Sequence, residues 1–263
     1  MPEVLKIGVV GGGGWLGGAI VDSILRGGLT APENICLSYR SRRPERFPGS
    51  FWTTDSQQLA DRSDVIILSV RPADWPFITM NARGKLVISV MAGIRLASIC
   101  VRHDTRRAVR SLPNAAAEVG KSYTPWVAAD DVGNEDRTTV RAIFDACGIQ
   151  DEVQSERDID YLTGLTGSGP AFPALLAAAM MEHAIGFGLS PEVANRAVNT
   201  LIVGAGRLVE HRHDPPDSVV DTFLDYRGTT AAAIKAMRAA GFDQSVAQGL
   251  AAAFEQSLRM GLS

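Results

Sequence analysis

Short apolar runs alternate with helix-like stretches through the first half of the chain, and this alternation restricts the fold more than any other feature. Five runs rich in Val, Ile and Leu are predicted to be strands: residues 4–10, 35–39, 65–70, 86–90 and 108–112. Helices are predicted at residues 15–26, 56–62 and 95–103. Such apolar strands suit a parallel sheet covered on both faces. The first half is therefore predicted to be α/β, with a doubly wound parallel sheet.

The pattern changes after Asp151, and from Glu156 onward the sequence predicts helices only. These are residues 171–188, 194–209, 229–240 and 244–260. We therefore expect two domains, residues 1–154 and residues 155–263. The helical half has more small apolar faces than it can bury alone. It is expected to form a homodimer or a higher homo-oligomer.

Composition excludes several other classes of protein. The 263 residues carry 26 Lys and Arg against 29 Asp and Glu, a net charge of −3, so a nucleic-acid partner is not expected. The three cysteines are far apart and the four histidines show no ligand spacing, so we expect neither disulfides nor a metal site. The longest apolar run, residues 171–181, is too short for a membrane span, and no secretory signal is evident. We therefore expect a cytoplasmic protein without a membrane partner.

A run of glycines follows the first predicted strand and opens the first predicted helix. Only Gly12, Gly14 and Gly17 satisfy the spacing G-x-G-x-x-G, with Trp15 and Leu16 between the last two glycines. In a dinucleotide-binding Rossmann domain, the first glycine permits a tight turn, the second lets the pyrophosphate approach, and the third brings the helix close to the sheet. The alternative is an ordinary structural turn.

The end of the second predicted strand indicates which dinucleotide binds. An NAD-binding protein usually has an acidic residue there for the ribose 2′-hydroxyl. This chain has Arg40, Ser41 and Arg42 instead, which suit a 2′-phosphate. We therefore expect NADP(H) to be preferred over NAD(H). A solvated basic turn is the alternative.

The ends of the remaining predicted strands should line the nicotinamide side of the same crevice, because ligands bind at the carboxyl ends of parallel strands. The residues assigned to this side are Val70, Arg71, Pro72, Ala92, Gly93 and Asn114.

These turns, together with one in the second half, resemble the pyrroline-5-carboxylate reductase family over essentially the whole chain. The most specific match is residues 165–171 (LTGSGPA), similar to the family's L-S-G-S-G-P-A. Residues 70–72 (VRP), 88–94 (ISVMAGI) and 110–114 (RSLPN) also match. The resemblance implies a Rossmann domain, an all-helical dimerisation domain, and hydride transfer from NAD(P)H to the C=N bond of a cyclic imino acid.

The resemblance also implies where the substrate binds. The family's carboxylate-binding loop, S-P-G-G-T-T, corresponds to residues 225–230 (DYRGTT). On this basis Thr230 and Ser168 are the expected catalytic residues, with Thr230 bonded to the imine nitrogen. The expected substrate-binding residues are Gly167, Asp225, Arg227, Gly228 and Thr229. Helix capping by Thr229 and a structural role for Ser168 are the alternatives.

The chain departs from the family pattern mainly at the substrate loop. Asp225 and Arg227 could recognise a different imino acid, or they could pair with each other at the surface. A β-hydroxyacid dehydrogenase is a second interpretation. Such enzymes typically use a lysine on an early helix of the second half, whereas the only lysine after residue 150, Lys235, lies in a late helix. A catalytically silent NADP-binding regulator is a third.

Overall fold

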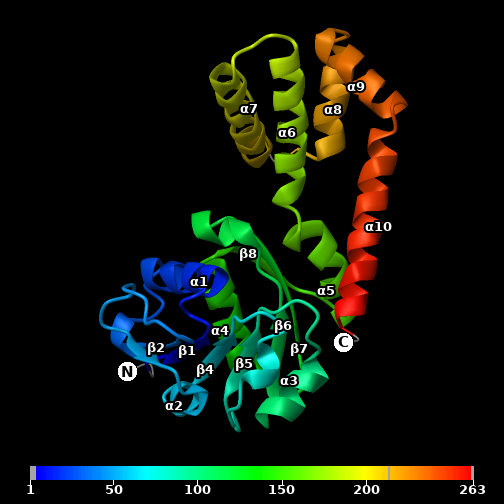
Figure 1. Ribbon diagram of the computed structural model, residues 1–263. Helices are drawn as coiled ribbons and strands as arrows, with labels where there is room; N and C mark the ends of the chain where they lie inside the picture. The colour runs from blue at the N-terminus through cyan, green and yellow to red at the C-terminus, as the bar shows by residue number, and fades with distance from the viewer. Residues whose placement is uncertain (1–3, 213, 262–263) are drawn as a thin grey trace. The chain divides into compact units, whose positions relative to one another are not determined.

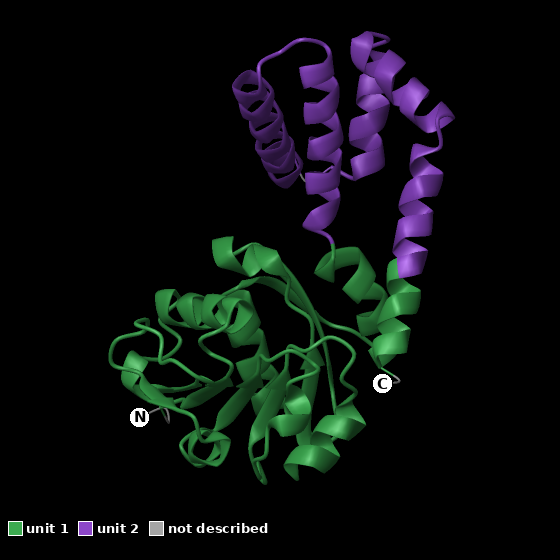
Figure 2. Cartoon of the chain, viewed as in Figure 1, with its two compact units in different colours: residues 1–168, 253–263 green, residues 169–252 purple. Residues whose placement is uncertain are grey.

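The computed structural model describes residues 4–212 and 214–261, and the chain divides into two compact units. Unit 1 comprises residues 1–168 and 253–263, and unit 2 comprises residues 169–252 (Figure 2). These units differ from the predicted domains, 1–154 and 155–263, because the segment before residue 169 and the last turns of the final helix pack with the rest of unit 1. The domain boundary between residues 154 and 155 stays a prediction.

In the part of unit 1 that the structure describes, eight strands form one sheet in the order β3-β2-β1-β4-β5-β6-β7-β8 (Figure 1). The strands are β1 (Ile7–Val10), β2 (Ile35–Ser38), β3 (Phe51–Thr53), β4 (Val65–Leu68), β5 (Leu86–Ser89), β6 (Arg107–Ser111), β7 (Ser122–Ala128) and β8 (Gly148–Glu152). The five predicted strands are confirmed as β1, β2, β4, β5 and β6. All pairs from β3 to β6 are parallel.

The far side of the sheet was not predicted. β7 runs antiparallel to β6, and β8 pairs parallel to β7, so the sheet is mixed at this end. β7 contains Pro125, a residue that usually argues against a strand, and every residue of β8 is at least partly exposed.

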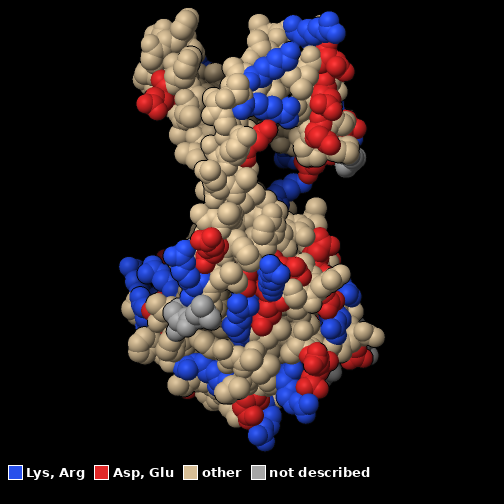
Figure 3. All heavy atoms as spheres, turned by 90° about the vertical axis from the view of Figure 1, so that its right-hand side faces the viewer, with Lys and Arg blue, Asp and Glu red and all other residues tan. Residues whose placement is uncertain are grey.

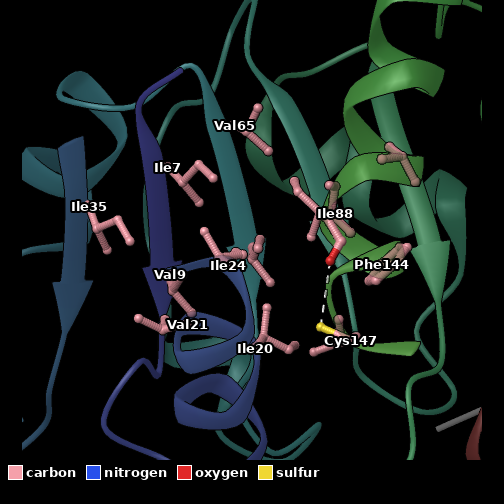
Figure 4. Packing of buried hydrophobic residues seen from close by; sticks show 14 of the residues in the cluster. Ile7, Val9, Ile20, Val21, Ile24, Ile35, Val65, Ile88, Phe144 and Cys147 are labelled. Carbon is pink, nitrogen blue, oxygen red and sulfur yellow. Dashed lines mark hydrogen bonds between the residues drawn. The ribbon is translucent and has the colours of Figure 1, made fainter. Parts of the chain in front are cut away.

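Within the described part of unit 1 the helices before residue 163 are α1 (Trp15–Arg26), α2 (Ser56–Asp61), α3 (Leu96–His103), α4 (Asn134–Asp145) and α5 (Glu156–Leu162). Successive strand residues contribute to opposite faces: Ile7 and Val9 join one core cluster and Val10 joins the other. The first cluster includes residues of α1 and α4, and Figure 4 shows Ile20, Ile24 and Phe144 within it. The second includes residues of α2 and α3. The doubly wound architecture is thus confirmed.

The cysteines of this core are free thiols. Cys36 and Cys147 are buried, and Cys147 donates a hydrogen bond to the carbonyl of Ile143 at 3.5 Å (Figure 4). Burial raises the pKa of both thiols to about 11, so they remain protonated at neutral pH.

A cluster of buried charges joins β6, α5 and the end of the last helix, α10 (Phe242–Met260). The Arg110 side chain is 1% exposed and lies 2.6 Å from the equally buried Asp160 and 3.1 Å from Glu156. Asp160 also lies 3.0 Å from Arg95 and accepts a hydrogen bond from Ser257 at 3.4 Å. Two arginines therefore face two carboxylates, and the last turns of α10 are tied to unit 1.

Unit 2 is helical in all its described elements. It holds α6 (Ala171–Gly186), α7 (Pro191–Arg212), α8 (Pro216–Asp225), α9 (Thr229–Ala239) and the first part of α10 (Phe242–Met260). α6 is apolar around its circumference, yet it has no buried residue in the single chain. Among the residues of the structure, no helix is both long and apolar enough to cross a membrane. Figure 3 shows basic and acidic side chains interspersed on both units.

Candidate functional site

A cavity of about 630 Å³ lies at the carboxyl ends of β1, β2 and β4, within unit 1. Its walls come from the glycine turn after β1, the turn after β2 and the loop after β4. The lining residues that bear on its chemistry are Gly11, Gly13, Gly14, Ser38, Arg40, Ser41, Arg42, Ser69, Val70, Arg71, Asp74 and Phe77. This is the edge at which ligands of doubly wound sheets bind.

The tight turn after β1 depends on Gly11 rather than on Gly12. Gly11 has φ = +84°, and a Cβ atom added there would lie 2.2 Å from the carbonyl oxygen of Ser69. The Gly11 N–H donates to Ser38 Oγ at 2.9 Å, which fixes the turn against the end of β2. Gly12 does not have a left-handed backbone, and an added Cβ would instead meet the Leu37 side chain at 2.7 Å. The prediction that Gly12 permits the turn was therefore wrong by one residue.

The other two motif glycines bring the N-terminus of α1 to the cavity. Gly14 is the N-cap and lines the cavity, while a Cβ atom at Gly17 would lie 2.5 Å from the Gly11 carbonyl. The α1 N-terminus has no side-chain cap and no acidic residue in its first turn. By contrast, Asp55 caps α2 by accepting from the N–H groups of Gln57 and Gln58. The positive end of α1 is therefore available to a phosphate.

The two residues between these glycines lie elsewhere. The Trp15 indole N–H donates to Glu118, and its side chain lines a separate cavity of about 230 Å³ with Asp22 and Arg46. Leu16 packs against the first core cluster. The side chains of Trp15 and Leu16 therefore do not line the cofactor cavity. Only their backbone, at the start of α1, could serve the predicted cofactor role.

The predicted 2′-phosphate residues Arg40, Ser41 and Arg42 are brought together on the cavity wall. All three are exposed. Arg40 Nη1 lies 3.3 Å from Oδ1 of Asp74, which lines the same cavity. Asp74 was not predicted from the sequence.

The loop after β4 forms the opposite wall. Val70 and Arg71 line the cavity as predicted, whereas Pro72 sits in the turn and its carbonyl accepts from Trp75 N–H at 3.3 Å. Phe77, also missed by the sequence analysis, lines the cavity with 80% of its surface exposed.

The predicted nicotinamide-side residues from β5 and β6 do not line this cavity. Ala92 packs against the small core cluster that contains Leu112 and Ile159. Gly93 is covered by Met260, whose atoms lie 2.9 Å from the position of an added Cβ.

Asn114 is hydrogen-bonded inside unit 1. Its Nδ2 donates to the Thr166 carbonyl at 3.0 Å, and its Oδ1 accepts from Ala116 N–H at 2.9 Å. The structure therefore gives it a positioning role: it ties the end of β6 to the turn that carries Gly167 and Ser168.

That turn is η4 (Thr163–Gly167), a single π-helical turn after α5. Ser168 follows it, and both its N–H and its Oγ donate to the Thr163 carbonyl, at 3.0 and 3.3 Å. An added Cβ at Gly167 would lie 2.7 Å from Leu112 Cδ2, so the Leu112 side chain packs closely against this turn. Ser168 is exposed, so its hydroxyl can still accept a hydrogen bond from a ligand.

The predicted substrate loop lies in unit 2, between α8 and α9. Gly228 is the N-cap of α9 and offers no side-chain cap, and Thr229 and Thr230 begin the helix in exposed positions. Arg227 has φ = +52°, a left-handed conformation, at a position where the family loop has glycine. Among the described residues, neither Asp225 nor Arg227 has an ion-pair partner, so the predicted alternative of a mutual surface pair is not observed.

A buried histidine anchors the loop after β4. The indole N–H of Trp75, in the turn η2 (Trp75–Phe77), donates to Nε2 of His103 at 2.9 Å. The His103 Nδ1 lies 3.4 Å from the Met80 carbonyl oxygen, so this nitrogen carries the proton and the ring is neutral. Burial lowers the pKa of His103 below its usual value, although the bond to Met80 opposes this shift.

Because the folded pKa of His103 is depressed, protonation favours the unfolded chain. The free energy of unfolding should be unaffected above pH about 6.5 and should fall below it, by up to about 1.4 kcal/mol per pH unit. His103→Gln, which keeps a donor and an acceptor, should remove this part of the slope. Urea unfolding followed by tryptophan fluorescence between pH about 5 and about 7.5 measures it. His183→Gln, at an exposed position, should keep the slope; an unchanged slope in His103→Gln would contradict the assignment.

Within residues 4–212 and 214–261, no group of three or more His, Cys, Asp or Glu side chains is arranged so that it could hold a metal ion.

Comparison with known proteins identifies relatives of both parts of the chain. Residues 156–260 match the family model "pyrroline-5-carboxylate reductase dimerisation", and residues 6–93 match "NADP oxidoreductase coenzyme F420-dependent". A pyrroline-5-carboxylate reductase of Synechocystis is 28% identical over 265 residues, which cover 98% of each chain. One from Methanosarcina acetivorans is 29% identical and covers 98% of this chain and 99% of its own.

Solved structures are similar along nearly the whole chain. The pyrroline-5-carboxylate reductase of Coxiella burnetii is 26% identical, with a TM-score of 0.89, and covers 98% of this chain and 99% of its own. The pyrroline carboxylate reductase of Plasmodium falciparum, solved with NADP bound, is 25% identical, with a TM-score of 0.84 and 98% coverage of both chains.

Proposed function

Because the chain belongs to the pyrroline-5-carboxylate reductase family, we propose that it reduces a cyclic imino acid, pyrroline-5-carboxylate or a close analogue, with NADPH as the preferred hydride donor. The reaction transfers hydride to the carbon of the C=N bond, and the protonated nitrogen becomes the ring amine. It is the chemistry of an oxidoreductase that acts on CH–NH bonds.

The observation that carries this proposal is the cavity at the carboxyl ends of β1, β2 and β4. It combines an uncapped helix N-terminus for the pyrophosphate with Arg40, Ser41 and Arg42. Guanidinium groups favour a 2′-phosphate over a 2′-hydroxyl, which supports NADP(H) over NAD(H). When bound, the cofactor supplies the hydride, and the protein has to bind, orient and protect the reactants.

We assign the substrate carboxylate to the N-terminus of α9, where the N–H groups after Gly228 carry the positive end of the helix dipole. The Thr230 hydroxyl is proposed to hydrogen-bond the imine nitrogen, and Ser168 to contact the substrate. A protonated imine is already electrophilic, so positioning matters more than a strong general base.

Arg227 and Asp225 favour a substrate that differs from the family's common one. Their charges lie beside the proposed carboxylate site without ion-pair partners among the described residues. We propose that Arg227 binds a carboxylate and that Asp225 interacts with an amino or iminium group. Arg227→Gly and Asp225→Ser should therefore change the relative kcat/KM among cyclic imines rather than scale every value equally.

The same family resemblance supports a homodimer formed through the helical unit in the cytoplasm. The exposed apolar side chains of α6 and α7, including Phe172, Leu175, Leu201 and Val203, fit this proposal. Association would bury them.

One experiment tests substrate and cofactor together. NADPH absorbance should fall when the protein is mixed with pyrroline-5-carboxylate, pyrroline-2-carboxylate or a six-membered analogue. The double variant Arg40→Glu, Arg42→Glu should raise the KM for NADPH by about tenfold or more and leave that for NADH nearly unchanged. Arg83→Glu with Arg106→Glu, two exposed arginines outside the cavity, is the matched control.

Two results would contradict the proposal. NADPH binding without turnover of any imine would favour the silent regulator over the reductase. Equal use of NADH and NADPH, unaffected by the charge reversal, would overturn the cofactor assignment.

A further inference from the structure

The carboxylate of Asp74 lies on the cavity wall that is proposed to receive the 2′-phosphate. Its Oδ1 is 3.3 Å from Nη1 of Arg40, and both residues line the cavity. A carboxylate at this place is unfavourable for NADP(H), because it repels the phosphate and occupies the guanidinium that should bind it. The same carboxylate does not repel the 2′-hydroxyl of NAD(H), which can donate a hydrogen bond to it.

Of the two partners, Asp74 is the one whose position is fixed. Its N–H donates to the Arg71 carbonyl at 2.9 Å, which closes the turn after β4. The next residue, Trp75, is bonded to the buried ring of His103 and lies under the guanidinium of Arg102, 5.1 Å from the ring centroid. These contacts hold the backbone of Asp74 in place from both sides.

Arg40 is the partner that can move. It follows the end of β2, its side chain is 85% exposed, and its Nη1 donates a hydrogen bond to Asp74 Oδ1 at 3.3 Å. Exposed pairs of this kind are weak, so a phosphate with two negative charges can take the guanidinium from the carboxylate.

We infer that Asp74 is a specificity-determining residue that competes with the 2′-phosphate for Arg40 and thereby limits the preference for NADP(H) over NAD(H). The inference rests on the proposed assignment of Arg40 to the 2′-phosphate. When NADP(H) binds, Arg40 exchanges Asp74 for the phosphate, whereas NAD(H) leaves the pair intact. Asp74 therefore lowers the affinity for one cofactor selectively.

The test is calorimetric titration of NADP+ and NAD+ into the full-length protein and its Asp74→Asn variant. Asparagine keeps the shape of the side chain and removes its charge. NADP+ should bind about fivefold more tightly to the variant, and the affinity for NAD+ should stay the same or fall. The gain should shrink at about 0.5 M salt, because the charges are exposed and salt screens them.

Asp131→Asn is the matched control. Asp131 is 47% exposed and pairs with Arg106, itself 84% exposed, at 2.7 Å, outside the cavity. The Asp131→Asn variant should bind both cofactors as tightly as the wild type does. An equal gain in Asp131→Asn would show that net charge is responsible and would overturn the inference.

The remaining outcomes separate this inference from the proposed function. If the wild type prefers NADP+ and Asp74→Asn binds NADP+ no more tightly, competition by Asp74 is disproved while the cofactor assignment stands. If the wild type has no preference and Arg40→Glu changes neither affinity, the cofactor assignment fails and the role of Asp74 fails with it.

Discussion

Asp160→Asn is expected to lower the free energy of unfolding of unit 1 by about 3–5 kcal/mol, because it leaves the charge of Arg110 buried without its main partner. Arg110 is 1% exposed, and its Nη2 lies 2.6 Å from Asp160 Oδ1. The same substitution removes a charge that faces Arg95 at 3.0 Å. Arg110 would then keep its ion pair with Glu156 only, and Arg95 would lose its ion pair with Asp160.

Urea unfolding followed by tryptophan fluorescence measures this loss in unit 1 alone, since all four tryptophans, Trp15, Trp52, Trp75 and Trp126, belong to that unit. The exposed Asp131→Asn should change the free energy by no more than about 0.5 kcal/mol. A loss below about 1 kcal/mol in Asp160→Asn would mean that water or rearrangement compensates Arg110 and that the cluster is not a tightly coupled one.

Gly11→Ala is expected to weaken NADP+ binding by about a hundredfold, equivalent to about 2.7 kcal/mol. The added Cβ would lie 2.2 Å from the Ser69 carbonyl oxygen, and the backbone at φ = +84° disfavours any side chain. The turn would have to shift away from the loop after β4, which takes the α1 N-terminus out of the position that is proposed to receive the pyrophosphate.

Gly28→Ala separates the steric clash from the backbone preference. Gly28 also has a left-handed backbone, at φ = +66°, but no atom lies within 4 Å of an added Cβ. This control should lose about 1 kcal/mol of stability and bind NADP+ normally. Titration of both variants with NADP+ gives the comparison, and normal binding by Gly11→Ala would refute the role of this turn.

The core of the fold could be predicted from sequence because its strands are buried on both faces. Residues such as Ile66 and Ile67 in β4 point to opposite core clusters, so the whole strand is apolar and easily recognised. β3 has three residues, and β8 (GIQDE) is largely polar, so neither carries such a pattern. The helix α4 was also missed, although Val140, Ile143 and Phe144 lie on one buried face.

The candidate site was predictable where the backbone alone determines it. Gly14 and Gly17 act through the absence of a side chain, and their spacing is visible in the sequence. Asp74 and Phe77 reach the cavity because the loop after β4 turns back at Trp75, and that turn depends on the distant His103. The sequence could not show where the Trp15 side chain points. It contacts Glu118 and does not line the cofactor cavity.

The discontinuity of unit 1 has a consequence for folding during translation. Residues 253–261 leave the ribosome after the whole helical unit, yet Ser257 bonds to Asp160 and Met260 covers Gly93. A nascent chain that has emerged as far as residue 168 holds the glycine turn but lacks these contacts. The nucleotide-binding half therefore cannot complete its packing in simple vectorial order, and it must wait for a segment made after the intervening helices.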